Sequence, residues 1–217
     1  HLEPDVHRLA EARHHLAHVH LHVLAIAVDH HGPTIRWAQR RRGDLDDLHL
    51  VEADVMAFDR PRVDLVAALN FSTFIYHTPD ALRAYLRHAR RCLRPGGHFV
   101  LDVYGGPGAQ RCGTQTRPAD GFVYHWEQRR FDPLTHRTDC RIHFTLPDGR
   151  RLKSAFRYDW RLWTLPELTG LMQKAGFGRV DVWTANRAGR VVPAKAVPAA
   201  DDWVAYLVGT RTPPGIA

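Results

Sequence analysis

The chain has 217 residues, of which 44% are hydrophobic, and this is enough for one domain with a sizeable core. Its formal net charge is +7, but no arginine cluster is interleaved with aromatic residues as in single-strand binders, so the composition disfavours a nucleic-acid partner. No apolar run approaches the length that a membrane-spanning helix needs, so no membrane partner is expected.

The number and spacing of the cysteines and the N-terminal sequence indicate the cellular compartment of the protein. Cys92, Cys112 and Cys140 are far apart and odd in number, which argues against a disulfide framework and favours the reducing cytoplasm. The start shows no basic and then apolar pattern with a cleavage site, so no secretory signal is expected. Because the first residue is His1 and not Met, we expect a chain that is processed, shortened by cloning, or incomplete at this end.

The first half of the chain alternates between helix and strand patterns. Apolar residues at helical spacing predict an amphipathic helix over 5–19, and the continuous apolar run over 21–29 is typical of a strand buried in a parallel sheet. Pro33 and Thr34 open a second predicted helix. Further strands are predicted over 48–55, 63–70 and 98–106, and a helix that Thr78 caps and Pro79 begins is predicted to end at the turn "LRPGG" over 93–97. This alternation indicates an α/β sheet with parallel strands.

The second half begins with a different pattern. Residues 107–121 are rich in Gly and Pro and predict a loop. Runs over 121–131, 137–146 and 151–163 follow with turn residues between them, and they predict an antiparallel meander inserted into the α/β domain. Thr164 and Glu167 have the spacing of a capping box, which predicts a helix from 164. Two last strands are predicted over 179–187 and 202–211, with a Pro/Ala-rich loop between them.

Polar residues stand where the predicted parallel strands end. Asp29 ends the first strand, Asp54 the second and Asn70 the third, and the fourth ends near Tyr104. Ligands bind at the carboxyl ends of such strands, where one acid can accept two ribose hydroxyls and the next can accept an adenine amino group. The alternative for Asp29 alone is a cap on the following helix. Two consecutive strand-end acids favour a nucleoside-containing cofactor.

Several stretches, in this order and spacing, resemble the class I S-adenosylmethionine-dependent methyltransferases. The stretch "VLAIAVDHHGPTIRWAQRR" resembles the second strand and helix of that family, and "VEADVMAFD" resembles its third-strand motif. The stretches "VDLVAALN", "LRHARRCLRPGGHFVLDVY", "ELTGLMQKAGFGRVDVW" and "WVAYLVGTR" resemble its later elements. The resemblance covers about residues 5 to 106 and 164 to 211.

The resemblance implies a fold, a cofactor and an activity. The fold is α/β, a doubly wound Rossmann-like methyltransferase sheet in one domain over 1–217, and the inserted β-rich region over 107–163 would form a substrate lid. The activity is methyl transfer from S-adenosylmethionine to a small-molecule acceptor. The cofactor would be bound by the residues that follow the strands, namely Asp29, His30, Asp54, Val55, Asn70 and Phe71.

One motif of the family is absent from this sequence. The family's first strand ends in a glycine-rich loop of the D-x-G-x-G type, where backbone N–H groups approach the methionine part of the cofactor. Such a strand and loop would precede the helix over 5–19, so we expect them upstream of His1 in a longer protein, or lost in a degenerate member. The sheet would then have a gap between the strands that end at Asp29 and Asn70. The chain would bind its cofactor weakly and would be inactive if the loop is not replaced.

Methyl transfer from a sulfonium is an in-line displacement that depends mainly on approach and alignment. Asn70 and Tyr76 are therefore the candidate catalytic residues, as positioning groups that follow the third strand. His77 is a candidate general base, although its place just before the helix cap favours an ordinary surface histidine.

The predicted meander carries aromatic residues at alternate positions, which places them on one face of a strand. We expect them to line a substrate site or, equally, to form ordinary core. The candidate substrate-binding residues are Tyr104, Trp126, Arg157 and Trp160.

Two other classes of function stay open. A nicotinamide-dependent oxidoreductase of the Rossmann type shares an acid at a strand end, but it requires G-x-G-x-x-G before Asp29, which is missing. A non-catalytic or metal-binding histidine-rich module would use His14 and His18 on a helix, or His18, His20 and His22 on a strand. No carboxylate or cysteine lies at a supporting spacing, so no metal is expected. The acceptor and the oligomeric state, a homodimer included, are left open.

Overall fold

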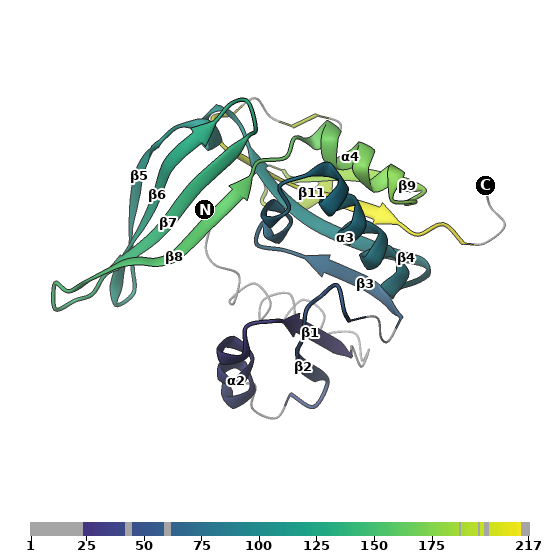
Figure 1. Ribbon diagram of the computed structural model, residues 1–217, viewed down its shortest axis with the longest axis horizontal. Helices are drawn as coiled ribbons and strands as arrows, with labels where there is room; N and C mark the ends of the chain where they lie inside the picture. The colour runs from purple at the N-terminus through teal and green to yellow at the C-terminus, as the bar shows by residue number, and fades with distance from the viewer. Residues whose placement is uncertain are drawn as a thin grey trace. The chain divides into compact units, whose positions relative to one another are not determined.

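The structure, a computed structural model, describes residues 24–41, 45–58, 62–186, 188–194, 196–197 and 200–213. The chain divides into two compact units, His1–Pro61 and Arg62–Ala217, and Figure 1 labels their elements. The helix predicted over 5–19 and the histidines at 14, 18, 20 and 22 lie outside the described residues. None of the described helices is long and apolar enough to cross a membrane.

The first unit contains a βαβ motif. The strand β1 (Ala25–Asp29) is followed by α2 (Gly32–Arg41) and by β2 (Leu48–Glu52), which pairs with β1 in parallel. The predicted strand over 48–55 was too long: β2 ends at Glu52, and Asp54 lies in the turn beyond it. The reason is local, because the Asp54 carboxylate accepts the Met56 N–H at 2.8 Å and its carbonyl oxygen accepts the Ala57 N–H at 2.9 Å.

A five-stranded sheet forms the centre of the second unit, in the order β10-β9-β11-β4-β3. Its strands are β3 (Val63–Ala68), β4 (Leu93–Gly105), β9 (Arg179–Ala185), β10 (Val191–Pro193) and β11 (Trp203–Thr210). The strands β3 and β4 are parallel, whereas β11 runs antiparallel to both β4 and β9. The short strand β10 was not predicted. It lies in the Pro/Ala-rich segment and forms by pairing with the end of β9.

The strand β4 begins earlier than predicted and includes the stretch "LRPGG". Gly96 has a left-handed φ of 80°, and its N–H donates to the Arg211 carbonyl oxygen at 2.8 Å. The Arg211 N–H donates in turn to the Gly97 carbonyl oxygen at 2.9 Å. These backbone bonds hold the glycine turn in the sheet, although its composition is typical of a helix stop.

Two helices lie side by side over one face of this sheet (Figure 1). The helix α3 (Pro79–Cys92) packs against β3 and β4, and α4 (Leu165–Lys174) packs against β9 and β11. Both predicted caps are confirmed: the Thr78 hydroxyl accepts the Ala81 N–H at 3.3 Å, and Thr164 forms a capping box with Glu167. The core between the helices and the sheet includes Leu82, Leu86, Leu93, Phe99, Leu101, Leu168 and Met172.

An antiparallel sheet extends from one end of the second unit (Figure 1). Its strands lie in the order β5 (Gly113–Ala119), β6 (Phe122–Asp132), β7 (Arg137–Thr145) and β8 (Arg151–Arg161), so the meander is confirmed. The prediction of a loop over 107–121 was wrong, because this segment contains a short 3-10 helix (Pro107–Gln110) and β5. Every residue of β5 is exposed, so the strand has no apolar alternation to reveal it.

Candidate functional site

A tight turn follows the carboxyl end of β3 and is hydrogen-bonded to β4. Asn70 and Phe71 follow β3 with left-handed φ angles of 62° and 56°. Both of their N–H groups donate to the carboxylate of Asp102 on β4, at 2.9 Å for Asn70 and 2.7 Å for Phe71. The chain then enters a short 3-10 helix (Ser72–Ile75) that leads towards α3. The turn lies at the edge of the sheet where a parallel α/β arrangement predicts a ligand.

Six aromatic rings gather beside the turn, and we call them the aromatic cluster. Phe71 and Tyr104 have ring centroids 4.8 Å apart, and Trp160 lies 6.4 Å from both. The other members are Phe74, Trp126 and Tyr158. Three of the predicted substrate residues, Tyr104, Trp126 and Trp160, therefore come together. Trp160 is buried in the hydrophobic core, so the rings serve partly as core.

The fourth predicted substrate residue lies apart from the cluster. Side chains alternate between the two faces of a strand, so Arg157 faces away from Tyr158 and Trp160 on β8. Its side chain is exposed, in contrast to the buried Trp160. The aromatic positions on this strand thus share one face, and the arginine lies on the other.

The hydroxyl group of Tyr104 is buried, and no described residue supplies it with a hydrogen-bond partner. Burial raises the pKa of Tyr104 above its ordinary value, and the nearby Cys140 and Asp202 raise it further. The group therefore stays a neutral hydroxyl that can donate a hydrogen bond. A buried hydroxyl without a partner is costly, and a bound ligand or water would satisfy it.

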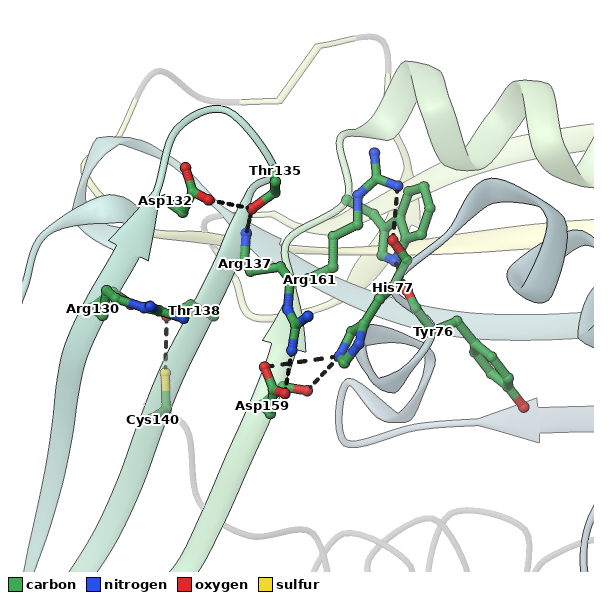
Figure 2. A network of polar contacts seen from close by, with 11 residues as sticks. Tyr76, His77, Arg130, Asp132, Thr135, Arg137, Thr138, Cys140, Asp159 and Arg161 are labelled. Atoms are coloured by element: carbon green, nitrogen blue, oxygen red, sulfur yellow. Dashed lines mark hydrogen bonds and ion pairs between the residues drawn. The ribbon is translucent and has the colours of Figure 1, made fainter.

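The two other candidates from the sequence lie next to each other but face different ways (Figure 2). The Tyr76 ring stacks on Tyr85 of α3 at 4.9 Å. His77 points towards β8, where its Nε2 lies 2.8 Å from the Asp159 carbonyl oxygen. Because a carbonyl oxygen only accepts, Nε2 carries the proton, and Nδ1 of the neutral ring is an acceptor. A hydrogen bond thus connects His77 to the antiparallel sheet.

In the first unit, Asp29 and Asp54 follow the two parallel strands. The Asp29 Oδ1 accepts the His31 N–H at 2.8 Å, whereas the N–H groups of the first turn of α2 donate to the His31 carbonyl oxygen. Asp29 therefore does not cap the helix directly. Its side chain is 45% exposed, and the adjacent His30 and Val55 are also exposed.

The first unit has two carboxylates at the positions where the sequence predicts contacts with the nucleoside part of the cofactor. Asp29 and Asp54 each use Oδ1 to accept a backbone N–H, and their Oδ2 atoms have no hydrogen-bond partner among the described residues. Such oxygens accept hydroxyl or amino protons. The other predicted cofactor residues, Asn70 and Phe71, belong to the second unit. The described residues contain no group of three or more His, Cys, Asp or Glu side chains placed to hold a metal ion.

Sequence reasoning missed Asp102 on β4, which holds the turn that follows β3. An acid within the apolar run "HFVLDVY" was the available signal, because a buried carboxylate requires partners. The roles that the sequence assigns to these residues stay predictions.

Comparisons with known proteins agree with this architecture. A family model described as "Methyltransferase domain" matches residues 10–101. The CcbJ methyltransferase from Streptomyces caelestis has a TM-score of 0.70 at 19% identity, covering 95% of this chain and 78% of that chain. An amino pentose methyltransferase from Micromonospora echinaspora, solved with S-adenosylmethionine bound, has a TM-score of 0.60 at 18% identity, covering 86% and 73%.

A third solved structure is a sugar N-methyltransferase from Streptoalloteichus. It has a TM-score of 0.63 at 20% identity and covers 95% of this chain and 76% of that chain. No curated protein sequence matches the chain. The structural likeness shows a shared Rossmann-like fold.

Proposed function

We propose that this chain is a class I methyltransferase and that it transfers methyl groups from S-adenosylmethionine to a small-molecule acceptor. The observation that carries the proposal is the pair of strand-end carboxylates within the matched segment, Asp29 and Asp54, whose Oδ2 atoms have no partner among the described residues. Two of the similar solved structures are named as methyltransferases of sugars, which supports a small acceptor.

The residues of the first unit would hold the nucleoside part of the cofactor. Asp29 would accept the ribose hydroxyls, with His30 beside it, and Asp54 would accept the adenine amino group, with Val55 against the ring. Asn70 and Phe71 would contribute from the turn after β3. When bound, the cofactor supplies an electrophilic methyl group on a sulfonium.

The residues of the second unit would hold the acceptor. The buried Tyr104 hydroxyl would donate a hydrogen bond to it, and Trp126 and Trp160 would exclude water. Asn70 would orient the attacking atom, with Tyr76 beyond it. His77, whose Nε2 faces the Asp159 carbonyl oxygen, would take a proton from an amine or hydroxyl through its Nδ1. The sheet of β5–β8 would act as the lid.

We also propose that the protein works in a reducing compartment, the cytoplasm. No disulfide bond joins Cys92, Cys112 and Cys140, which is the usual state of cysteines there. Burial raises the pKa of the Cys140 thiol to about 11, so this thiol is unreactive near neutral pH.

Removal of the Asp29 carboxylate tests the cofactor site. We expect wild-type chain to bind S-adenosylhomocysteine with a Kd in the millimolar range, because the sequence lacks the glycine-rich loop that would hold its amino-acid part. Asp29→Ala should weaken this binding at least tenfold, measured by NMR titration, since the ribose hydroxyls lose their charged acceptor.

Asp46→Ala is the matched control, because Asp46 is an exposed acid of the same unit outside the proposed site. It should leave the affinity unchanged. An unchanged affinity in Asp29→Ala would contradict the ribose assignment, and a wild-type Kd at or below micromolar would show that another part of the chain replaces the missing loop.

Removal of one oxygen tests the acceptor site. Tyr104→Phe should raise the free energy of unfolding by about 1 kcal/mol, because it removes a buried hydroxyl that lacks a partner. It should also lower methyl transfer to a panel of small amines about tenfold, measured with isotope-labelled cofactor. A variant that is both less stable and fully active would overturn this role for Tyr104.

A further inference from the structure

The carboxylate of Asp102 extends the pairing of β3 and β4 beyond the backbone ladder. The ladder ends at Ala68 and Leu101, and Asp102 is the next residue of β4. Its side chain is only 5% exposed, and its Oδ2 and Oδ1 atoms accept the N–H groups of Asn70 and Phe71 at 2.9 Å and 2.7 Å. One side chain thus satisfies two consecutive backbone N–H groups that lie beyond the end of the ladder.

The two donors need this support because of their backbone conformation. Asn70 and Phe71 have φ angles of 62° and 56°, in the left-handed region, where the Cβ atom of an L-residue comes too close to the backbone. Asparagine tolerates this region, but a bulky phenylalanine rarely adopts it. Two charge-assisted hydrogen bonds, which are stronger than hydrogen bonds between neutral groups, offset this strain.

The turn that Asp102 holds determines where two functional groups lie. It sets Asn70 at the carboxyl end of β3, which is the ligand edge of a parallel sheet. It also turns the Phe71 ring against Tyr104, with centroids 4.8 Å apart, and the Phe71 carbonyl oxygen accepts the Phe74 N–H at 2.9 Å. The start of the 3-10 helix and the wall of the aromatic cluster therefore depend on this turn.

We propose that Asp102 is a positioning residue for the ligand edge. By accepting both N–H groups, it keeps Asn70 and Phe71 in the strained turn from which they meet the cofactor and the acceptor. The effect of Asp102 on ligand binding rests on the proposed function. Its effect on the turn rests only on the hydrogen bonds and backbone angles. Asp102 acts through the two residues that it holds.

The Asp102→Asn variant tests the turn without a ligand. The amide has the same shape, but one oxygen becomes an NH2 donor that cannot accept an N–H, so one hydrogen bond is replaced by two facing donors. We expect amide hydrogen exchange at Asn70 and Phe71 to accelerate at least tenfold, while the amides of Leu101 and Val103 keep their rates. Unchanged exchange at the turn, or equal acceleration across β4, would overturn the proposal.

The same variant tests the connection to the ligand. In an NMR titration with S-adenosylhomocysteine, Asp102→Asn should bind at least fivefold more weakly than wild type. The control Asp64→Asn, in an exposed acid on β3 that pairs with Arg94, should bind as wild type does. Faster exchange with an affinity equal to that of the control would overturn the role at the ligand edge. A wild-type chain without any binding would instead contradict the proposed function, while exchange still decides whether Asp102 holds the turn.

A second variant covers the case in which Asp102→Asn does not fold. Adding Asn70→Gly places a residue that adopts positive φ without strain in the turn, so the chain needs less support from Asp102. Recovery of folding in the double variant, followed by circular dichroism, supports the proposal. No recovery means that Asp102 stabilises the core by other contacts, and the proposal fails.

Discussion

Replacement of Trp160 by alanine is expected to lower the free energy of unfolding by about 3–5 kcal/mol. The Trp160 side chain is 6% exposed, and its ring contacts members of the aromatic cluster from β4, from β6 and from the 3-10 helix after β3. Its removal would leave a cavity where the antiparallel sheet meets the central sheet, because none of these elements can close onto another. Urea denaturation measures the loss.

A phenylalanine on the same strand and the same face provides the control. Phe156 is 52% exposed, so Phe156→Ala should cost less than about 1 kcal/mol. If Trp160→Ala costs no more than this control, the ring is not a core residue, and the alternative of a solvent-accessible substrate wall is favoured. If it costs several kcal/mol, Trp160 supports the site mainly by holding the two sheets together.

Arg161→Ala is expected to have the second largest effect, a loss of about 2 kcal/mol. The guanidinium is held between three partners: it donates to the Glu167 Oε1 at 2.9 Å and to the His77 carbonyl oxygen at 3.3 Å, and it lies 3.7 Å over the Trp163 ring. The side chain is 16% exposed, so water replaces these contacts poorly. Glu167 itself is partly exposed, which keeps the loss below that of a fully buried pair.

Arg161→Lys separates charge from geometry, because lysine keeps the charge but cannot form the planar fork. It should recover less than half of the lost stability. The exposed pair of Arg94 and Asp64, with atoms 2.7 Å apart, is the control, and Arg94→Ala should cost less than about 1 kcal/mol. Equal losses for Arg161→Ala and Arg94→Ala, measured by urea denaturation, would show that the Arg161 contacts add nothing beyond a surface ion pair.

The fold was predicted well where neighbouring residues decide the structure. Thr78 caps α3 and Thr164 caps α4, because a cap needs only a hydroxyl and a backbone N–H three residues further on. Strand β5 was missed because its seven residues are exposed and include Gly113 and Pro118. Its signal was the pair Asp120 and Gly121, a two-residue hairpin turn with a left-handed φ of 78° at the glycine.

For the candidate site, the sequence identified single residues but not which of them lie together. Tyr104, Trp126 and Trp160 were chosen as separate residues, and the structure brings them together. Arg157 was chosen with them, although its odd spacing from Trp160 places it on the opposite face of β8. The rule of alternation was sufficient to place it outside the cluster, and its role at the substrate stays a prediction.

The sequence by itself determined the alternation of strands and helices, the meander, the caps and the acids that follow the parallel strands. Each of these depends on residues a few positions apart, where spacing alone specifies the hydrogen bonds or the face. Only the tertiary structure decided the left-handed turn at Asn70 and Phe71, because its carboxylate partner lies 32 and 31 residues away on another strand. It also decided the aromatic cluster, which forms only when two sheets pack together, since no local pattern records which distant rings will meet.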